Sequence, residues 1–267
     1  MLRKNNIQSI DFNGFYMEQR KRSSFKPKGK HDWDAKAEDF NRRVHKSGYN
    51  REFVERVAVG PGETLLDIGC GVGNLSLPFA KKCKQVVALD FSPNMLAFLR
   101  ENMEKEGVGN ITSLELCWND DWSAVPETDV VIASRSMEVD DMEAALKKMD
   151  AKARRAVYLS YKVGGSFVDP KSLDVMGRDV ESKPDYIYIL GILYNLGINA
   201  SVSFIESEGR GSFFESAEDY VASVRWSLGE MTEAEADRLR EYYASLDDEK
   251  RKYLKAPVKW AFISWEK

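Results

Sequence analysis

The sequence predicts an α/β fold built on a mostly parallel sheet. Beyond the Gly60-Pro61-Gly62 turn, short apolar runs alternate with segments of helical periodicity, which is typical of parallel strands joined by helical crossovers. The first of these runs ends in three closely spaced glycines, so a tight turn joins it to the next helix. With 267 residues and 43% hydrophobic composition, the chain can bury a sizeable core.

Strands are expected wherever a run of four to eight apolar or β-branched residues is bounded by turn residues. The run at 64–68 stops at the glycines and is apolar enough to be buried on both faces of a sheet. The expected strands are residues 64–68, 85–89, 111–117, 129–134, 156–161, 200–206 and 258–265.

Helices are expected between these strands. The clearest begins after Ser92, a good N-cap, with Pro93 in its first turn and Gly107 at its end. Met95, Leu99 and Met103 form one apolar stripe on it. The other helices expected between strands are residues 74–82, 141–149 and 186–196.

Two regions lie outside this alternation. Residues 1–30 lack periodicity and read as a flexible arm, and residues 32–57 read as one cap helix; we therefore divide the chain into an arm and cap helix at 1–58 and a domain at 59–267. Residues 207–257 form an insertion between the sixth and seventh strands. Capping boxes at Ser216 and Thr232 predict that it is helical and serves as a lid or a partner surface.

Net charge, cysteine content and the lack of long apolar runs each exclude some classes of protein. The net charge of -4 argues against a protein built throughout for nucleic acid, although residues 1–46 hold twelve basic against six acidic residues. That basic arm is either a solvated leader or a patch for an anionic partner. Three cysteines without C-x-x-C spacing predict no disulfide framework and no metal site. No apolar run has the length of a membrane span and no signal peptide is evident, so we expect a cytoplasmic protein, with a homodimer as one option.

The glycine turn and the acids beside it indicate which kind of cofactor the protein binds. Gly69, Gly71 and Gly73 follow G-x-G-x-G spacing, which lacks the third position of the G-x-G-x-x-G pyrophosphate fingerprint. Asp67 stands two residues before the first glycine. A carboxylate there disfavours a diphosphate and suits a cofactor that carries positive charge. Asp90, twenty-one residues after Gly69, ends the second strand, where an acid accepts hydrogen bonds from ribose hydroxyls.

These residues, Leu65 to Gly73 together with Asp90 to Met95, resemble the first two motifs of class I S-adenosylmethionine-dependent methyltransferases. The resemblance covers about residues 60–165. It implies a Rossmann-like methyltransferase fold: a seven-stranded, mostly parallel sheet with an antiparallel last strand and helices on both faces. It also implies S-adenosylmethionine as cofactor and S-adenosylhomocysteine as product.

The resemblance further implies a set of cofactor-binding positions. The glycine loop would contact the methionine part, Asp90 the ribose and Met95 the adenine, and an acid after the third strand the adenine amino group, for which Asp121 is preferred over Asp120. The full expected set is Asp67, Gly69, Cys70, Gly71, Gly73, Asp90, Phe91, Ser92, Met95, Asp120, Asp121, Trp122, Ser134 and Arg135. Trp122 is either a wall of the adenine pocket or a core aromatic, and Cys70 is a packing residue.

Substrate residues are less defined. Arg135 and Ser136 follow the fourth strand, where the family's loop faces the acceptor, and Arg135 would bind a carboxylate or phosphate or pair with a nearby acid. Trp33, Phe40 and Tyr188 are aromatic candidates for the substrate pocket or for packing. No catalytic residue is identified, because an activated methyl group needs alignment rather than a defined acid–base pair. His31 and His45 are candidate bases but fit exposed helix positions better.

The sequence thus predicts transfer of a methyl group to a small-molecule acceptor. One alternative is an RNA or protein methyltransferase that uses the basic arm. The other is a binding protein that keeps the cofactor site without turnover. A nicotinamide-dependent dehydrogenase is disfavoured by the glycine spacing.

Overall fold

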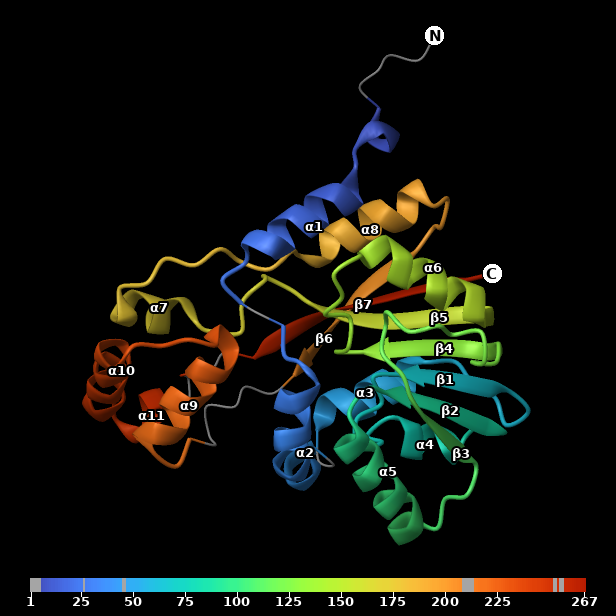
Figure 1. The fold of residues 1–267 in the computed structure, drawn as a ribbon, viewed down its shortest axis with the longest axis horizontal. Helices are drawn as coiled ribbons and strands as arrows, with labels where there is room; N and C mark the ends of the chain where they lie inside the picture. Colours follow the sequence, from blue (N-terminus) through green and yellow to red (C-terminus); the bar gives the residue numbers. More distant parts are fainter. Residues whose placement is uncertain (1–5, 26, 45–46, 208–213, 252–253, 255–256) are drawn as a thin grey trace.

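The sheet places β1 (Thr64–Ile68) between β2 and β4, in the order β3-β2-β1-β4-β5-β7-β6 (Figure 1). The computed structural model describes residues 6–25, 27–44, 47–207, 214–251, 254 and 257–267. β7 alone runs antiparallel to its two neighbours, so the expected seven-stranded sheet with an antiparallel last strand is confirmed. The other strands are β2 (Gln85–Asp90), β3 (Ile111–Glu115), β4 (Thr128–Ser134), β5 (Ala153–Lys162), β6 (Ser201–Ser207) and β7 (Val258–Glu266).

Helices cover both faces because the central strands are apolar on both sides. One hydrophobic cluster joins the sheet to α6 (Met142–Lys152) and α8 (Tyr186–Asn195). A second cluster joins the opposite face to α4 (Ser76–Ala80) and α5 (Pro93–Glu106). The signals expected for α5 hold: the Ser92 side chain accepts the Met95 N–H, and Gly107 ends the helix at φ 65°.

The N-terminal segment differs from its prediction. A short 3-10 turn (Ile7–Ser9) leads into α1 (Phe12–Arg22), which packs against α8, so the expectation of a flexible arm is wrong from residue 12 onward. Tyr16 of α1 is fully buried, and its hydroxyl donates to the Val139 carbonyl at 2.7 Å. The segment is ordered by these tertiary contacts, which its weak periodicity did not reveal.

The single cap helix expected at 32–57 is two helices, α2 (Lys30–Val44) and α3 (Gly48–Arg56). The two pack in different places: α2 contacts α5, whereas α3 contacts β6. α3 buries Tyr49 and Phe53 in the cluster on its face of the sheet. The two halves of the predicted helix therefore cover two different surfaces.

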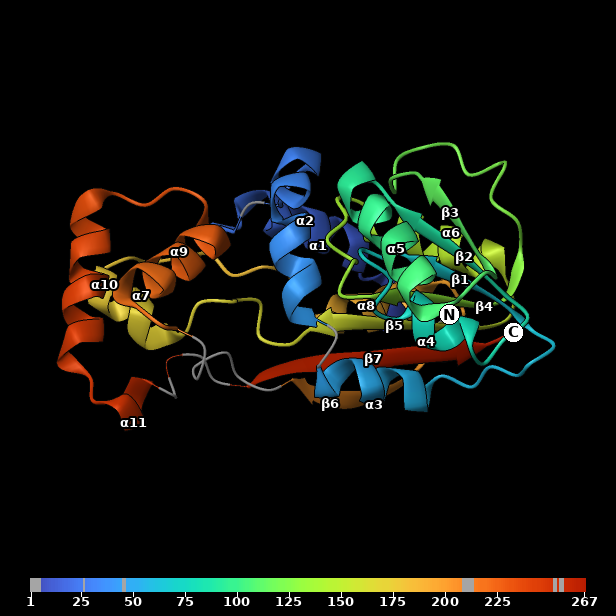
Figure 2. The same ribbon diagram turned by 90° about the horizontal axis from the view of Figure 1, so that it is seen from below.

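A helical lobe stands beside the sheet (Figure 2). It contains α9 (Ala217–Leu228), α10 (Glu233–Ser245) and α11 (Asp248–Arg251) of the expected helical insertion, together with α7 (Pro170–Met176), which was not predicted. Its own hydrophobic cluster includes Tyr220, Leu239 and Phe25. In both views α2 lies between this lobe and α5. No helix in the described part of the chain has the length and apolarity needed to cross a membrane.

Candidate active site

The glycine loop follows β1 and bends through three left-handed glycines: Gly69 at φ 71°, Gly71 at 55° and Gly73 at 94°. A Cβ on Gly69 would stand 2.3 Å from Ser136 Cβ, and one on Gly73 would stand 2.5 Å from Leu99 Cδ1. These two glycines therefore let the loop pack against the β4 loop and against α5. Cys70 is buried between them, and burial raises the pKa of its thiol, in agreement with a packing role.

Two buried carboxyl groups flank this loop. Asp67 Oδ2 accepts the Ser76 hydroxyl at 2.6 Å, and burial, opposed by that bond and reinforced by the charge of Asp90, raises the pKa of Asp67 to about 7. Asp90 accepts the N–H groups of Gly71 at 2.8 Å and Ser92 at 2.9 Å. Burial raises the pKa of Asp90 as well. Among the described residues, no basic side chain lies within ion-pair distance of either acid.

The groups at the loop form an acceptor-rich set, with no cationic partner among the residues that the structure describes. Asn74, directly after Gly73, has a buried side-chain oxygen without a hydrogen-bond partner. A carboxylate oxygen that already accepts one N–H still has capacity for a further donor. The site therefore fits a ligand with hydroxyl and ammonium donors and a positive charge, such as S-adenosylmethionine.

Helix α2 covers the loop. Phe40 Cε1 lies 3.6 Å from the position of a Cβ on Gly71, and Phe40 packs with Ala37, Val72 and Met95. Asp34 fixes the start of the helix by accepting the Ser92 hydroxyl at 2.6 Å. The structure thus brings Phe40 and Met95 to the loop.

Trp33 lies on the same helix, with its ring centroid 6.1 Å from that of Phe40 and 5.8 Å from that of Trp226 in the lobe. It therefore lies where α2 meets the lobe. Phe91, between Asp90 and Ser92, is half-buried.

The acids after β3 are engaged within their own turn. Asp120 accepts the Cys117 N–H at 2.7 Å, and Asp121 accepts the N–H and hydroxyl of Ser123. Both carboxylates are exposed, and these bonds hold the pKa of each below its usual value. Trp122 is 4% exposed and stacks on Trp118 within the core cluster.

The loop after β4 is tied to α3 and β5. Arg135 has φ 58°, the one left-handed non-glycine residue in the described ranges, and its N–H donates to Ser160 Oγ at 3.0 Å. Tyr49 brings the strands together, because its hydroxyl contacts Ser134 Oγ at 2.8 Å and donates to Ser160 Oγ at 2.6 Å. The Arg135 guanidinium lies 4.4 Å from the Tyr49 ring centroid and donates to Asn50.

Ser136 joins this loop to the glycine loop by donating its hydroxyl to the Ile68 carbonyl at 2.6 Å. Sequence reasoning missed Tyr49 and Ser160, because neither lies in a motif. Tyr188 belongs to another layer: it packs against Tyr16 in the α1–α8 layer, away from Trp33 and Phe40 on α2. His31 is exposed, and His45 lies outside the described residues.

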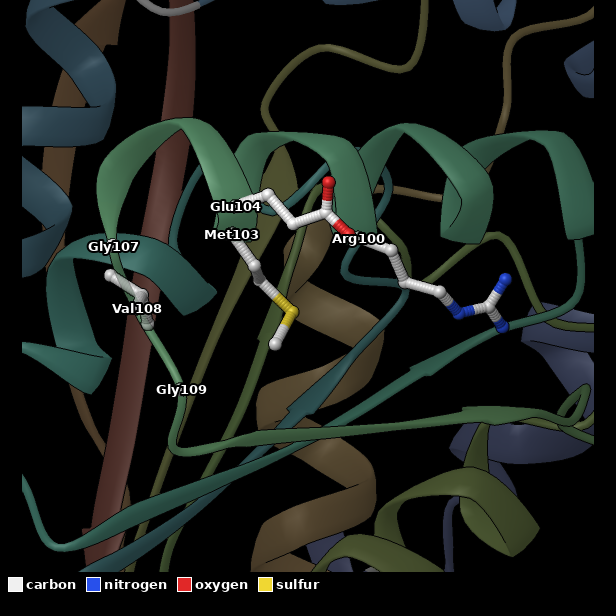
Figure 3. Close-up of a pocket in the computed structure, with 6 residues that line it drawn as sticks. All are labelled: Arg100, Met103, Glu104, Gly107, Val108 and Gly109. Atoms are coloured by element: carbon white, nitrogen blue, oxygen red, sulfur yellow. The ribbon is translucent and has the colours of Figure 1, made fainter.

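A hollow of about 400 Å³ lies at the end of α5, lined by Arg100, Met103, Glu104, Gly107, Val108 and Gly109 (Figure 3). At 1.5 Å of rise per residue, its lining begins about 8 Å along the helix from Met95 and extends away from it. It is therefore distinct from the glycine-loop site.

Comparison with known proteins agrees with this geometry. Residues 65–155 match the family described as "Methyltransferase domain". An uncharacterized protein of Haemophilus influenzae is 37% identical over 235 residues, which are 87% of this chain and 88% of that protein. A probable cobalt-precorrin-6B C(15)-methyltransferase of Methanobrevibacter smithii is 26% identical over 126 residues, covering 43% of this chain and 66% of that protein.

Two solved structures share the fold. A cyclopropane-fatty-acyl-phospholipid synthase-like protein from Lactobacillus casei superposes with a TM-score of 0.56 at 15% identity, covering 95% of this chain and 99% of the other. Coclaurine N-methyltransferase bound to N-methylheliamine and S-adenosylhomocysteine superposes with a TM-score of 0.52 at 13% identity, covering 98% and 96%. The sheet order and the glycine loop define a methyltransferase-type α/β protein.

Within that class, the chain belongs to the class I S-adenosylmethionine-dependent methyltransferases. The Haemophilus protein is its relative over most of both chains.

Proposed function

We propose that this protein transfers the methyl group of S-adenosylmethionine to a small-molecule acceptor by in-line displacement. The observation that carries the proposal is the pair of buried acids, Asp67 and Asp90, beside a left-handed glycine loop with no cation within ion-pair distance among the described residues. When bound, the cofactor supplies a methyl group already activated on a sulfonium.

The residues of this chain then bind and align. Asp90 would hold the ribose hydroxyls through the remaining acceptor capacity of its two oxygens. Asp67 and the Asn74 oxygen would accept from the polar end of the cofactor, and Met95 and Phe40 would supply its apolar contacts. Exclusion of water by α2 favours a transfer in which the positive charge of the cofactor is dispersed.

The cover over the site supports a small acceptor. Trp33 of α2 contacts Trp226 of the lobe, so helices close the approach that a large target would need. Basic residues of the N-terminal segment are partly engaged inside the chain: Arg20 binds Asp140 at 2.9 Å, and Lys30 binds Glu115. These pairs weaken the alternative in which the segment holds RNA.

A thermal melt with S-adenosylmethionine, S-adenosylhomocysteine and NAD tests the cofactor assignment. A ligand at about 100 times its dissociation constant adds roughly 2.7 kcal/mol, which for a chain of this size is a melting rise of about 5 to 10 °C. We expect the rise with the two adenosyl ligands and none with NAD. A rise with NAD alone, or none with any ligand at saturation, contradicts the proposal.

Charge substitution separates the small-molecule and RNA hypotheses better than truncation, because removing α1 would take away buried Tyr16 and uncover the surface of α8 that α1 packs on. Lys21 and Arg22 are exposed at the end of α1. We expect Lys21→Gln with Arg22→Gln to leave RNA affinity, and its dependence on salt, unchanged. A lower affinity with a shallower salt slope would favour an RNA target. A methylated small-molecule product would exclude the non-catalytic alternative.

A further inference from the structure

Lys162 ends β5 at the edge of the sheet where the acceptor of the proposed reaction would approach. It pairs in register with Trp260 of β7 and lies two residues beyond Ser160, which pairs with Ser134 of β4. Residues two apart on a strand share a face, so Lys162 lies on the face from which Tyr49 binds Ser160. Neither the glycine-loop motifs nor the family resemblance draws attention to this lysine.

The ammonium of Lys162 is half-buried and largely unused. It donates one hydrogen bond, to the Val163 carbonyl at 3.0 Å, and lies 5.0 Å from the centroid of the Phe167 ring. An ammonium has three N–H groups, so two remain available. Within the described part of the chain, no carboxylate oxygen lies within 4 Å of it.

The acidic groups around Lys162 already form ion pairs or hydrogen bonds with other residues. Glu138 binds Lys183 through both oxygens at 2.7 Å and also lies 3.6 Å from Arg20. Asp185 caps α8 by accepting the Tyr186 N–H, and it accepts the Gly164 N–H at 3.1 Å. The two acids whose charges act on Lys162 therefore accept hydrogen bonds from other donors.

Burial lowers the pKa of Lys162 to about 8; the charges of Asp185 and Glu138 raise it and that of Lys183 lowers it. A bound oxyanion would favour the protonated form and move this pKa upward. The protonated lysine would therefore be stabilised by a bound anion. Its neighbour Phe167 is partly buried and provides an apolar surface beside it.

We propose that Lys162 binds an oxyanion, a carboxylate or a phosphate, carried by the methyl acceptor. The inference rests on the proposed function and narrows its substrate class to acidic small molecules. Lys162 acts here as a binding and orienting residue. The Phe167 ring lies against the non-polar part of the acceptor.

Calorimetric titration with benzoate, phenyl phosphate and neutral benzamide tests this proposal at constant ionic strength, with and without S-adenosylhomocysteine. We expect benzoate or phenyl phosphate to bind and benzamide to bind at least tenfold more weakly. Lys162→Met should weaken anion binding by about 10- to 100-fold, the range for a charge-assisted hydrogen bond. The stronger of the two anions identifies the kind of oxyanion.

Lys152→Met is the matched control. Lys152 precedes the other end of β5 and likewise donates to one carbonyl, that of Val125. At about 3.3 Å per residue, it lies roughly 30 Å from Lys162 along the strand. Lys152→Met should bind the anion as the wild-type protein does, and Lys162→Arg should retain most of the affinity.

The pH profile adds a second readout. Anion affinity of the wild-type protein should fall as pH rises through about 8, whereas Lys162→Arg should show no such fall because a guanidinium stays charged. Equal binding of benzoate and benzamide, or unchanged affinity in Lys162→Met, overturns the proposal. Failure of S-adenosylhomocysteine to bind overturns the proposed function instead, because anion binding is also measured in its absence.

Discussion

Asp67 lies near the end of β1, where its side chain is buried (2% exposed) and accepts a hydrogen bond from Ser76. Its position before the glycines is a sequence feature, but its protonation is a property of the fold. A buried acid beside a second buried acid disfavours its own charge. Without a cationic ligand, Asp67 therefore carries a proton at a pH where an exposed aspartate is ionised.

This predicts a pH-dependent stability. The pKa of Asp67 rises from 3.8 to about 7, so between these values the folded protein binds a proton that the unfolded chain releases. The contribution of Asp67 to stability is present below about pH 4 and is lost as pH rises through 7. Asp67→Asn should remove this part of the decline when melting temperatures are compared from pH 4 to 8. Parallel profiles for the two proteins would contradict the assignment.

Asp90 carries a different prediction. Asp90→Ala should weaken S-adenosylhomocysteine binding by about 1.5 to 3 kcal/mol, because it removes a charge-assisted acceptor. Asp174→Ala, on the exposed surface of α7, serves as the control and should bind normally. Calorimetry on both variants measures the difference, and equal affinities would show that Asp90 does not hold the ribose.

Among the elements, α2 decides access to the site. Its start is fixed by Asp34 on Ser92, and its Phe40 ring lies against Gly71. A cofactor that uses Gly71 must meet this ring, so we expect α2 to move when the cofactor enters. The sequence predicted a helix here but did not indicate that Asp34 binds it to Ser92.

Loss of the hydrogen bond between Asp34 and Ser92 should speed the entry of the cofactor. Asp34→Ala removes the acceptor for the Ser92 hydroxyl, so we expect faster hydrogen exchange in α2 and faster association of S-adenosylhomocysteine, followed by intrinsic tryptophan fluorescence. Asp34→Asn is the control, because it keeps a hydrogen-bond acceptor and removes the charge near Asp90. If Asp34→Asn accelerates entry as much as Asp34→Ala does, charge rather than anchoring is responsible.

At the scale of the molecule, the lobe has a core of its own. Leu239 of α10 is fully buried in the cluster with Tyr220, apart from the two clusters that flank the sheet. The lobe and the sheet meet at α2 through the contact between Trp33 and Trp226. Damage inside the lobe should therefore leave the glycine loop intact.

Leu239→Ala tests this separation. We expect it to destabilise the lobe by about 2 to 5 kcal/mol, the cost of a buried Leu-to-Ala cavity, measured by denaturant unfolding. Affinity for S-adenosylhomocysteine should change by less than about twofold, since the hydrogen-bond partners of Asp67 and Asp90 among the described residues, Ser76, Gly71 and Ser92, lie outside the lobe. A comparable loss of cofactor affinity would mean that lobe and site are energetically coupled.

Local signals predicted much of the fold. The apolar runs placed the strands within three residues of their observed ends, and Ser92, Pro93 and Gly107 bounded α5 correctly. The same kind of signal was available for α7, where Asp169 caps a helix that starts at Pro170 and ends before Gly177, and was overlooked. By contrast, α1 is weakly amphipathic and is held by contacts with distant residues, so its sequence alone did not indicate order.

The sequence by itself determined the sheet, the glycine loop and the order of its two acids, because each depends on short-range patterns of apolarity, glycine and charge. Tertiary structure alone decided that Phe40 covers Gly71, that Tyr49 joins β4 to β5, and that Lys162 lacks a carboxylate within 4 Å in the described residues. The physical reason is that burial, pKa and pairing depend on neighbours brought from far along the chain, and no local pattern encodes which neighbours these are.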